Sequence, residues 1–168
     1  MPVDAVEFWD DISGAPLKPQ LVKAARAEEM KMFSKCEVYD KVSEDECWKE
    51  TGKGPIGTRW VDINKGDDSK LEYRSRLVAQ EIKKDKSKDL FAATPPLEAK
   101  KVLLSLFAST AVGTSGAPLA LDFVDVCRAY FRADAIRAVY VKLPREDEPD
   151  NRGRLHRAMP GTRDALGT

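Results

Sequence analysis

An apolar stretch in the last third of the chain carries a carboxylate to a point where the local pattern changes. Residues 119–126 are mostly apolar and favour a strand, and Asp125 lies near its end. A strand can hold a metal ligand in this way, with the main-chain carbonyl of Val126 beside it as a second oxygen donor. Tyr130 follows five positions after Asp125, near enough to line the same pocket. Taken alone, the pattern fits a metal ligand and a carboxylate that only ends a strand equally well.

Three basic residues in the middle of the chain form the second candidate group. Arg74 and Arg76 alternate with their neighbours, so the two-residue period of a strand places both on one face, and Lys65 lies nearby in sequence. Residues 52–88 hold 10 basic and 6 acidic residues (+4), whereas residues 1–51 hold 7 and 12 (−5). Such cations can bind a triphosphate or a nucleic-acid backbone. An ordinary amphipathic hairpin with its polar face in water explains the same residues equally well.

Two extended runs, residues 56–65 and 71–82, must position these cations. The turn residues 66–69 join them, which predicts a β-hairpin with Lys65 at its mouth. Apolar periodicity, proline and glycine predict the other elements. These are a helix over residues 20–35 with Val22, Ala25, Glu29 and Phe33 on one stripe, a strand at 36–42, a helix at 97–112 with Leu103, Leu104, Leu106 and Phe107 as its core face, a turn or short helix at 128–134, a strand at 138–143 and a last strand beginning within 155–159.

Composition limits the class of protein. A chain of 168 residues with 42% hydrophobic residues suits one domain or one and a half. The acidic N-terminus does not resemble a signal peptide, and the longest nearly apolar run, residues 102–112, is too short to cross a bilayer. We therefore expect an intracellular protein, cytoplasmic or nuclear, without a membrane partner. Cys36, Cys47 and Cys127 have neither zinc-ligand spacing nor an even count for disulfides.

Six segments of the sequence occur in the same order as in a known protein family. They are residues 27–30, residues 56–61 with Lys65, residues 73–79, Phe91 with Thr94 and Pro95, residues 125–131, and residues 139–144. Each is weak alone, but the ordered set resembles the N-terminal half, comprising the fingers and the first palm motif, of the reverse transcriptase domain of copia-type LTR retrotransposon polyproteins. The resemblance covers about residues 24–165.

The resemblance implies an α+β fold that forms part of a right-hand polymerase. We expect an irregular arm at residues 1–19 and a partial reverse transcriptase domain at residues 20–168. Its fingers, built on the β-hairpin, would span about residues 36–96. The start of the palm, about residues 97–165, would contain an incomplete antiparallel sheet and packed helices.

The resemblance also implies roles for the candidate residues. In that family the aspartate at the position of Asp125 and the next carbonyl, here that of Val126, bind two Mg²⁺ ions that activate the primer hydroxyl and neutralise the leaving pyrophosphate. Tyr130 falls at the aromatic position that selects deoxynucleotides, and Lys65, Arg74 and Arg76 would face the incoming triphosphate. The implied partners are an RNA template, a DNA primer and a deoxynucleoside triphosphate. Asp122 is a weaker rival to Asp125, because no alanine and aromatic pair follows it at the same spacing.

An aromatic-x-Asp-Asp motif closes the metal site in many reverse transcriptases, and residues 8–11 have this form. They precede Asp125 by more than a hundred residues and run into the turn residues 12–14, so we predict instead an acidic arm with two aromatic anchors. No such motif follows Asp125 in the 168 residues. Further departures are Pro160, where the family has tyrosine, and Leu166, where proline is usual.

One aspartate offers too few oxygen ligands for two Mg²⁺ ions, so we expect weak or no Mg²⁺ binding. The leading hypothesis is a truncated or degenerate RNA-directed DNA polymerase domain that does not polymerise alone. Robust primer extension by the purified chain, abolished by Asp125→Asn, would contradict it. One alternative is a non-catalytic nucleic-acid-binding remnant. A third reading is a poorly folded product of a decayed element, which a cooperative melt followed by circular dichroism would exclude.

Overall fold

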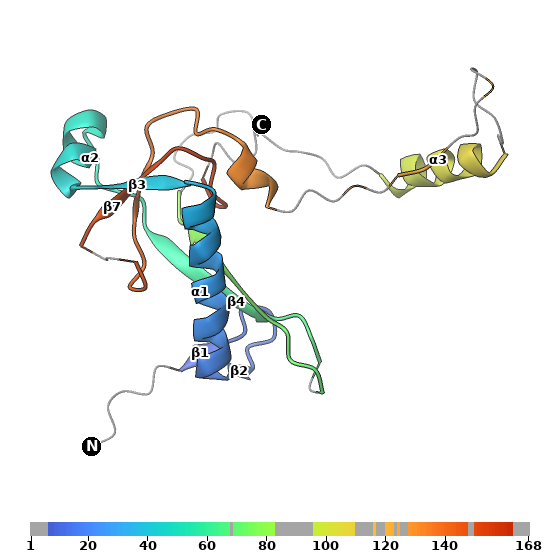
Figure 1. Cartoon of the computed structure of the whole chain (residues 1–168), viewed down its shortest axis with the longest axis horizontal. Helices are drawn as coiled ribbons and strands as arrows, with labels where there is room; N and C mark the ends of the chain where they lie inside the picture. Colours follow the sequence, from blue (N-terminus) through green and yellow to red (C-terminus); the bar gives the residue numbers. More distant parts are fainter. Residues whose placement is uncertain are drawn as a thin grey trace. The chain divides into compact units, whose positions relative to one another are not determined.

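The structure is a computed structural model that describes residues 7–67, 69–82, 96–109, 116, 120–122, 124, 128–147 and 150–162 (Figure 1). In this part of the chain it is an α+β structure with three α-helices, one short 3₁₀ helix and three small antiparallel sheets. In chain order the elements are β1 (Phe8–Trp9), β2 (Pro16–Leu17), α1 (Pro19–Lys35), β3 (Tyr39–Val42), α2 (Glu44–Thr51), β4 (Thr58–Asn64), β5 (Tyr73–Ala79), α3 (Leu97–Ser109), the 3₁₀ helix η1 (Ala129–Arg132), β6 (Tyr140–Lys142) and β7 (Arg152–Leu155). Two compact units contain them, residues 1–89 with 128–168 and residues 90–127.

Helix α1 confirms the expected helix and its stripe. Val22, Glu29 and Phe33 are buried and recur at helical spacing, while Pro19 occupies the first turn, where its missing N–H costs no hydrogen bond. After the helix Glu37 adopts a left-handed conformation, and the N–H of Val38 bonds back to the carbonyl of Phe33.

The expected β-hairpin is confirmed as the antiparallel pair β4–β5. Thr58 pairs with Ala79 at one end and Asn64 with Tyr73 at the other. Figure 1 shows α1 lying along this hairpin, with β1 and β2 near the first end of the helix and β3, α2 and β7 near its last. The hairpin is therefore supported along one face by α1.

A second sheet has the order β3-β7-β6, with β7 in the middle. Strand β7 spans Arg152–Leu155, so the last strand begins three residues before the predicted segment 155–159. The reason is alternation: Gly153 and Leu155 are buried, whereas Arg152 and Arg154 lie on the opposite face. Strand β6 lies within the strand predicted at residues 138–143.

The main core lies where α1, β5, η1 and the second sheet meet. Its fully buried side chains include Phe33, Val38, Leu77, Val141 and Met159. Phe131 joins this core from η1, with its ring edge-on to that of Phe33 and the ring centroids 4.7 Å apart. The short helix expected around residues 128–134 is thereby confirmed and anchored.

Two N-terminal segments differ from expectation. Residues 1–19 were expected to form an irregular arm, but within them β1 and β2 pair as a small hairpin whose Phe8 and Leu17 pack with Val22 of α1. The acidic segment after β3, for which no element was predicted, forms α2. Acidic side chains fill its first turn, where they stabilise a helix dipole, and Gly52 ends it in the left-handed conformation.

Helix α3 confirms the helix expected at residues 97–112 but not its core face. Leu103, Leu104, Leu106 and Phe107 are each at least 40% exposed. Of the apolar stretch at residues 119–126 the structure describes residues 120–122 and 124, and these form no strand. Within the described chain, none of the helices has the length and apolar character that crossing a membrane requires.

Candidate nucleic-acid interface

The hairpin β4–β5 presents one face away from the core. Cross-strand pairs join Arg74 to Ile63 and Arg76 to Val61, and residues directly opposite each other in a sheet share a face. The outer face, as we call it, consists of Arg59, Val61, Ile63, Arg74, Arg76 and Val78. Each of these side chains is exposed or half-buried, so cations alternate with β-branched residues on an accessible surface.

The inner face of the same hairpin holds it in place. Ser75, Leu77 and Ala79 are buried on β5, and Asp62 is buried opposite Ser75 on β4. The hydroxyl of Ser75 donates to Asp62 Oδ1 at 2.6 Å. The predicted alternation is therefore confirmed, since Ser75 and Leu77 point inward while Arg74 and Arg76 point outward.

Arg26 of α1 links the helix to this inner face. Its Nη2 donates to Asp62 Oδ2 at 2.7 Å, and its Nη1 donates to Glu146 Oε1 at 2.8 Å. Its guanidinium lies 4.8 Å from the ring centroid of Phe8 and 5.0 Å from that of Trp60. Burial alone would lower the pKa of Arg26, but the hydrogen bonds to Asp62 and Glu146 raise it, so the side chain stays charged inside the fold.

Asp10 and Asp11 close the free edge of β4. Asp10 Oδ2 accepts the N–H of Asn64 at 2.7 Å, and its Oδ1 accepts two N–H groups of the turn that follows it. Asp11 Oδ2 accepts the N–H of Asp62 at 2.8 Å. The backbone hydrogen bond from Asn64 is the largest of the effects that lower the pKa of Asp10 to about 2. These aspartates thus satisfy backbone donors, but of the two predicted aromatic anchors only Phe8 is buried, and Trp9 is 53% exposed.

Charge on the outer face is little compensated. Arg59 Nη1 lies 3.2 Å from Asp11 Oδ1, and both of these side chains are partly exposed. Lys65, Arg74 and Arg76 form no ion pair with any other residue that the structure describes. The hairpin therefore carries cations whose hydrogen-bond donors face water, which is the state required to bind phosphate oxygens.

The four expected nucleotide contacts are gathered only in part. Arg74 and Arg76 share the outer face, and Lys65 follows β4 at the mouth of the hairpin, where its N–H bonds to the carbonyl of Glu72. Tyr130 is 43% exposed on η1, next to Phe131, which packs into the core under the inner face. No hydrogen bond joins Tyr130 to the three basic residues within the described part of the chain.

The proposed metal ligands Asp125 and Val126 lie outside the described residues. The chain is well held three positions after Asp125, because Nη2 of Arg128 lies 2.9 Å from Oε2 of the buried Glu29 on α1. Arg128 has a left-handed backbone that leads directly into η1. Asp122, the rival carboxylate, is exposed and belongs to no strand.

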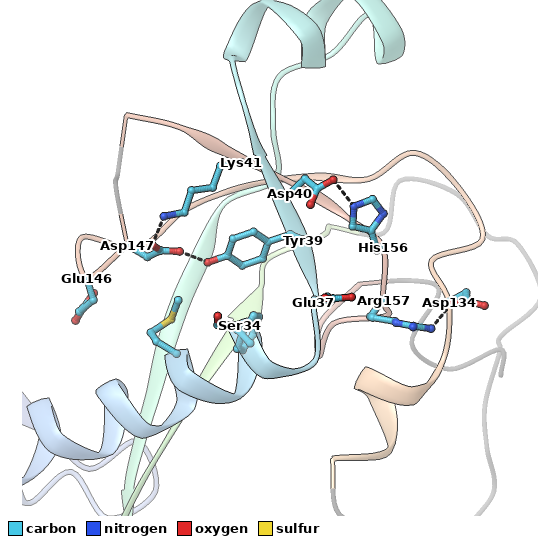
Figure 2. A pocket seen from close by; sticks show the side chains of 12 residues that line it. Ser34, Glu37, Tyr39, Asp40, Lys41, Asp134, Glu146, Asp147, His156 and Arg157 are labelled. Atoms are coloured by element: carbon cyan, nitrogen blue, oxygen red, sulfur yellow. Dashed lines mark hydrogen bonds and ion pairs between the residues drawn. The ribbon is translucent and has the colours of Figure 1, made fainter.

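A groove of about 820 Å³ lies beside the end of α1 and β3 (Figure 2). Phe33 and Tyr39 supply its apolar lining. Three pairs of oppositely charged groups lie along it: Lys41 with Asp147 at 2.6 Å, His156 with Asp40 at 2.7 Å, and Arg157 with Asp134. A second cavity of about 560 Å³ is lined by Cys47, Ile56 and Tyr140 among others. Neither contains Lys65, Arg74, Arg76 or Tyr130.

The described residues also supply no ready metal site. Within them, no three histidine, cysteine, aspartate or glutamate side chains gather in a way that could hold a metal ion. The clustered Asp10, Asp11 and Asp62 instead accept backbone and arginine donors.

Sequence reasoning missed two arginines. Arg59 could have been found from the hairpin register, since it lies two positions before Val61 on the first predicted strand and faces the same way as Arg76. Arg26 carried no local signal, because its partners Asp62 and Glu146 lie 36 and 120 residues away. Arg26 lies on α1 one turn after Val22 and one turn before Glu29 and Met30, so helical periodicity indicated only a partly buried position.

No family model, curated protein or solved structure matches this chain.

Proposed function

We propose that the chain belongs to a reverse-transcriptase-like domain and that the outer face of its β4–β5 hairpin binds phosphate groups of nucleic acid or of an incoming deoxynucleoside triphosphate. The observation that carries this proposal is the placement of Arg74 and Arg76 on one accessible face, without a carboxylate partner among the described residues. The proposed family rests on the resemblance of the ordered sequence segments around the hairpin.

The hairpin is suited to this task because its cations are held by a rigid inner face. Alternate residues on a strand are roughly 6.7 Å apart, so Arg74 and Arg76 can contact separate phosphate oxygens without backbone movement. Arg59 and Lys65 extend the cationic surface to both ends of the hairpin. Arginine donates two parallel hydrogen bonds to a phosphate, which favours this contact over a simple point charge.

Asp125 is the first palm carboxylate in this proposal, and the carbonyl of Val126 lies beside it in sequence. Its support is the resemblance of residues 125–131, together with the anchoring of Arg128 and Phe131, which holds the following segment on the core. Mg²⁺ is the ion that the family would place there. Phosphate binding by the hairpin, which the described residues can perform, remains the part of the function that the geometry supports best.

Binding is tested by fluorescence anisotropy of a labelled RNA–DNA hybrid of about 20 base pairs, at several salt concentrations. The Arg74→Gln/Arg76→Gln variant should lose about tenfold or more in affinity, and its dependence of log K on log salt should become shallower by nearly two. A deoxynucleoside triphosphate added as competitor distinguishes the two sources of phosphate. Displacement of the hybrid by it indicates a shared triphosphate site, and no displacement indicates backbone contact.

The matched control is Lys100→Gln/Lys101→Gln, which removes the same charge from adjacent exposed positions on α3. This control should change the affinity less than twofold, since nonspecific loss of charge is then the only effect. Equal losses in both variants, or affinity unchanged by the hairpin variant, would rule out the hairpin as the binding surface. Circular dichroism of each variant confirms that the comparison is between folded proteins.

A nucleic-acid-binding remnant without chemistry uses the same outer face and is the second candidate. The observation that favours it is that residues of β4 and β5 alone place Arg74 and Arg76 on one accessible face. Hybrid binding that depends on Arg74 and Arg76 but does not change in Asp125→Asn, with or without Mg²⁺, would select this candidate. Mg²⁺-dependent tightening that Asp125→Asn abolishes would select the polymerase assignment.

A further inference from the structure

Opposite charges meet on the face of the second sheet that points away from the core. Arg152 pairs with Lys142 across β6–β7, and Arg154 pairs with Tyr140, so these side chains share one face. Gly153 and Leu155, which alternate with the arginines, are buried on the other face. We call Lys142, Arg152 and Arg154 the basic strip. Asp40 of β3, which pairs with Arg154 across β3–β7, lies on the same face, and this face is separate from the outer face of the hairpin.

Helix α2 covers this strip with carboxylates. Glu44 accepts a hydrogen bond from Arg152 Nη2. Arg154 lies 3.9 Å from Glu46 Oε1 and 3.3 Å from Glu50 Oε1. The hydrogen bond from Arg152 is also the main reason why the pKa of Glu44 is lowered. Three glutamates of one short helix thus lie where the phosphates of a bound nucleic acid could lie.

The attachment of α2 is mostly electrostatic. Cys47 is the one side chain of this helix that is buried, and the glutamates that face the strip are partly exposed. Glu50 adds a hydrogen bond from the hydroxyl of Tyr140. Arg152 is only 15% exposed, but Arg154 and the three glutamates are 39–46% exposed. Exposed ion pairs contribute little stability each and weaken with salt. With so little apolar burial, α2 is expected to open locally at lower free energy than the strands beneath it.

We propose that α2 is an acidic cover of the basic strip and that nucleic-acid phosphates displace its glutamates, which makes β7 a second contact surface for the strand held by the hairpin. The inference rests on the proposed function for the class of ligand, but on different residues. A phosphate backbone is a better partner than three separate carboxylates, because it presents many charges on one chain and releases counterions on binding. Arg152 and Arg154, roughly 6.7 Å apart along β7, match a linear partner.

Hydrogen exchange of the full chain gives the most direct test. Oligodeoxythymidine of about 20 nucleotides serves as the probe, since a single strand follows a cationic groove without sequence preference. Amides of residues 44–51 should exchange faster in its presence, while amides of β6 and β7 become more protected. Unchanged or slower exchange in α2 would overturn the proposal, because an ordinary ligand only protects the surface that it touches.

Binding of the same oligonucleotide to variants of the protein tests the roles of the α2 glutamates and of the basic strip. The Glu44→Gln/Glu50→Gln variant should bind about fivefold tighter, because the strip is uncovered. Its matched control, Glu28→Gln/Glu98→Gln, changes the net charge equally at exposed positions and should gain less than twofold. Adding Arg152→Gln/Arg154→Gln to the uncovered variant should remove the gain. Equal gains in the two glutamate variants, or a gain that survives without the arginines, would contradict the cover.

The two proposals fail separately in this design. Suppose that the hairpin variant Arg74→Gln/Arg76→Gln binds as tightly as the unchanged protein, while Glu44→Gln/Glu50→Gln still strengthens binding. The proposed function of the hairpin is then wrong and the basic strip is the binding surface. If the hairpin variant loses affinity and uncovering has no effect, the hairpin function stands and the cover is wrong. Circular dichroism of each variant verifies that the substitutions have not unfolded α2 or the sheet.

Discussion

Arg26 of α1 and Asp62 of β4 form a two-point ion pair inside the fold. Nη2 lies 2.7 Å from Oδ2 and Nε lies 3.3 Å from Oδ1, and the side chains are only 15% and 8% exposed. The same carboxylate accepts the hydroxyl of Ser75 from β5. One aspartate therefore connects the helix to both strands of the hairpin that carries the proposed phosphate contacts.

Loss of Arg26 should destabilise the protein severely. Arg26→Met leaves Asp62 and Glu146 without their cation, and breaking a buried pair from one side costs about 3 kcal/mol or more in the free energy of unfolding. Arg26→Lys should recover only part of this, because an ammonium cannot form the same two-point contact. Urea unfolding measures both. Arg59→Met, which removes an exposed ion pair with Asp11, serves as the control and should cost less than about 1 kcal/mol.

Asp10 should make the stability depend on pH in the acid range. Its pKa is about 2 in the folded protein against 3.8 for the ordinary side chain, so the folded state binds this proton less tightly than the unfolded state. The stabilisation is therefore fully present above about pH 4 and is lost as the pH falls toward 2. Melting temperatures of the unchanged protein and Asp10→Asn should differ most near neutral pH and converge below pH 3. A constant difference across this range would contradict the assignment.

Tyr140 should titrate at unusually high pH. Burial, followed by its hydrogen bond to Glu50, raises its pKa to about 12. Because the folded state then holds the phenol proton more tightly than the unfolded state, the contribution of Tyr140 to stability is present below pH 10 and falls as the pH rises toward 12. Spectroscopic titration of tyrosinate should show a step near pH 12, and Tyr140→Phe should remove that step. A titration curve of Tyr140→Phe with the same late step as the unchanged protein would contradict the assignment.

Gly161 should not tolerate a side chain. It follows Pro160, whose carbonyl accepts the N–H of Ala79 at the free edge of β5, and a Cβ at Gly161 would lie 2.0 Å from the Ala79 carbonyl oxygen. Its φ of +85° adds backbone strain. Gly161→Ala should therefore cost about 3 kcal/mol or more, by thermal unfolding.

Gly14→Ala is the matched control for this substitution. Gly14 also has a positive φ, of +70°, but nothing lies within 4 Å of an added Cβ, so only the backbone strain of about 1 kcal/mol is expected. Similar losses in the two variants would show that the close approach to β5 is absent in solution. The contact also explains why proline is acceptable at position 160, since the bond to β5 uses its carbonyl and needs no N–H.

Local periodicity determined the elements that the sequence predicted correctly. The stripe of Val22, Glu29 and Phe33 repeats at helical spacing, and Ser75 and Leu77 alternate with Arg74 and Arg76, so α1 and the hairpin follow from neighbouring residues alone. The same rule predicted that both arginines share one face, and the structure shows that this face points away from the core. The polymerase assignment and the role of Asp125 rest on the sequence and remain predictions.

Tertiary structure decided everything that depends on distant partners. Arg26 reaches Asp62 and Glu146, and α2 places its glutamates against Arg152 and Arg154, which are about a hundred residues later in the chain. No local pattern encodes such pairs, because a charged residue in a strand or helix has the same sequence signal whether its partner is water or another side chain. The exposed leucines of α3 show the converse, since an apolar stripe predicts a helix but does not supply the surface that would cover it.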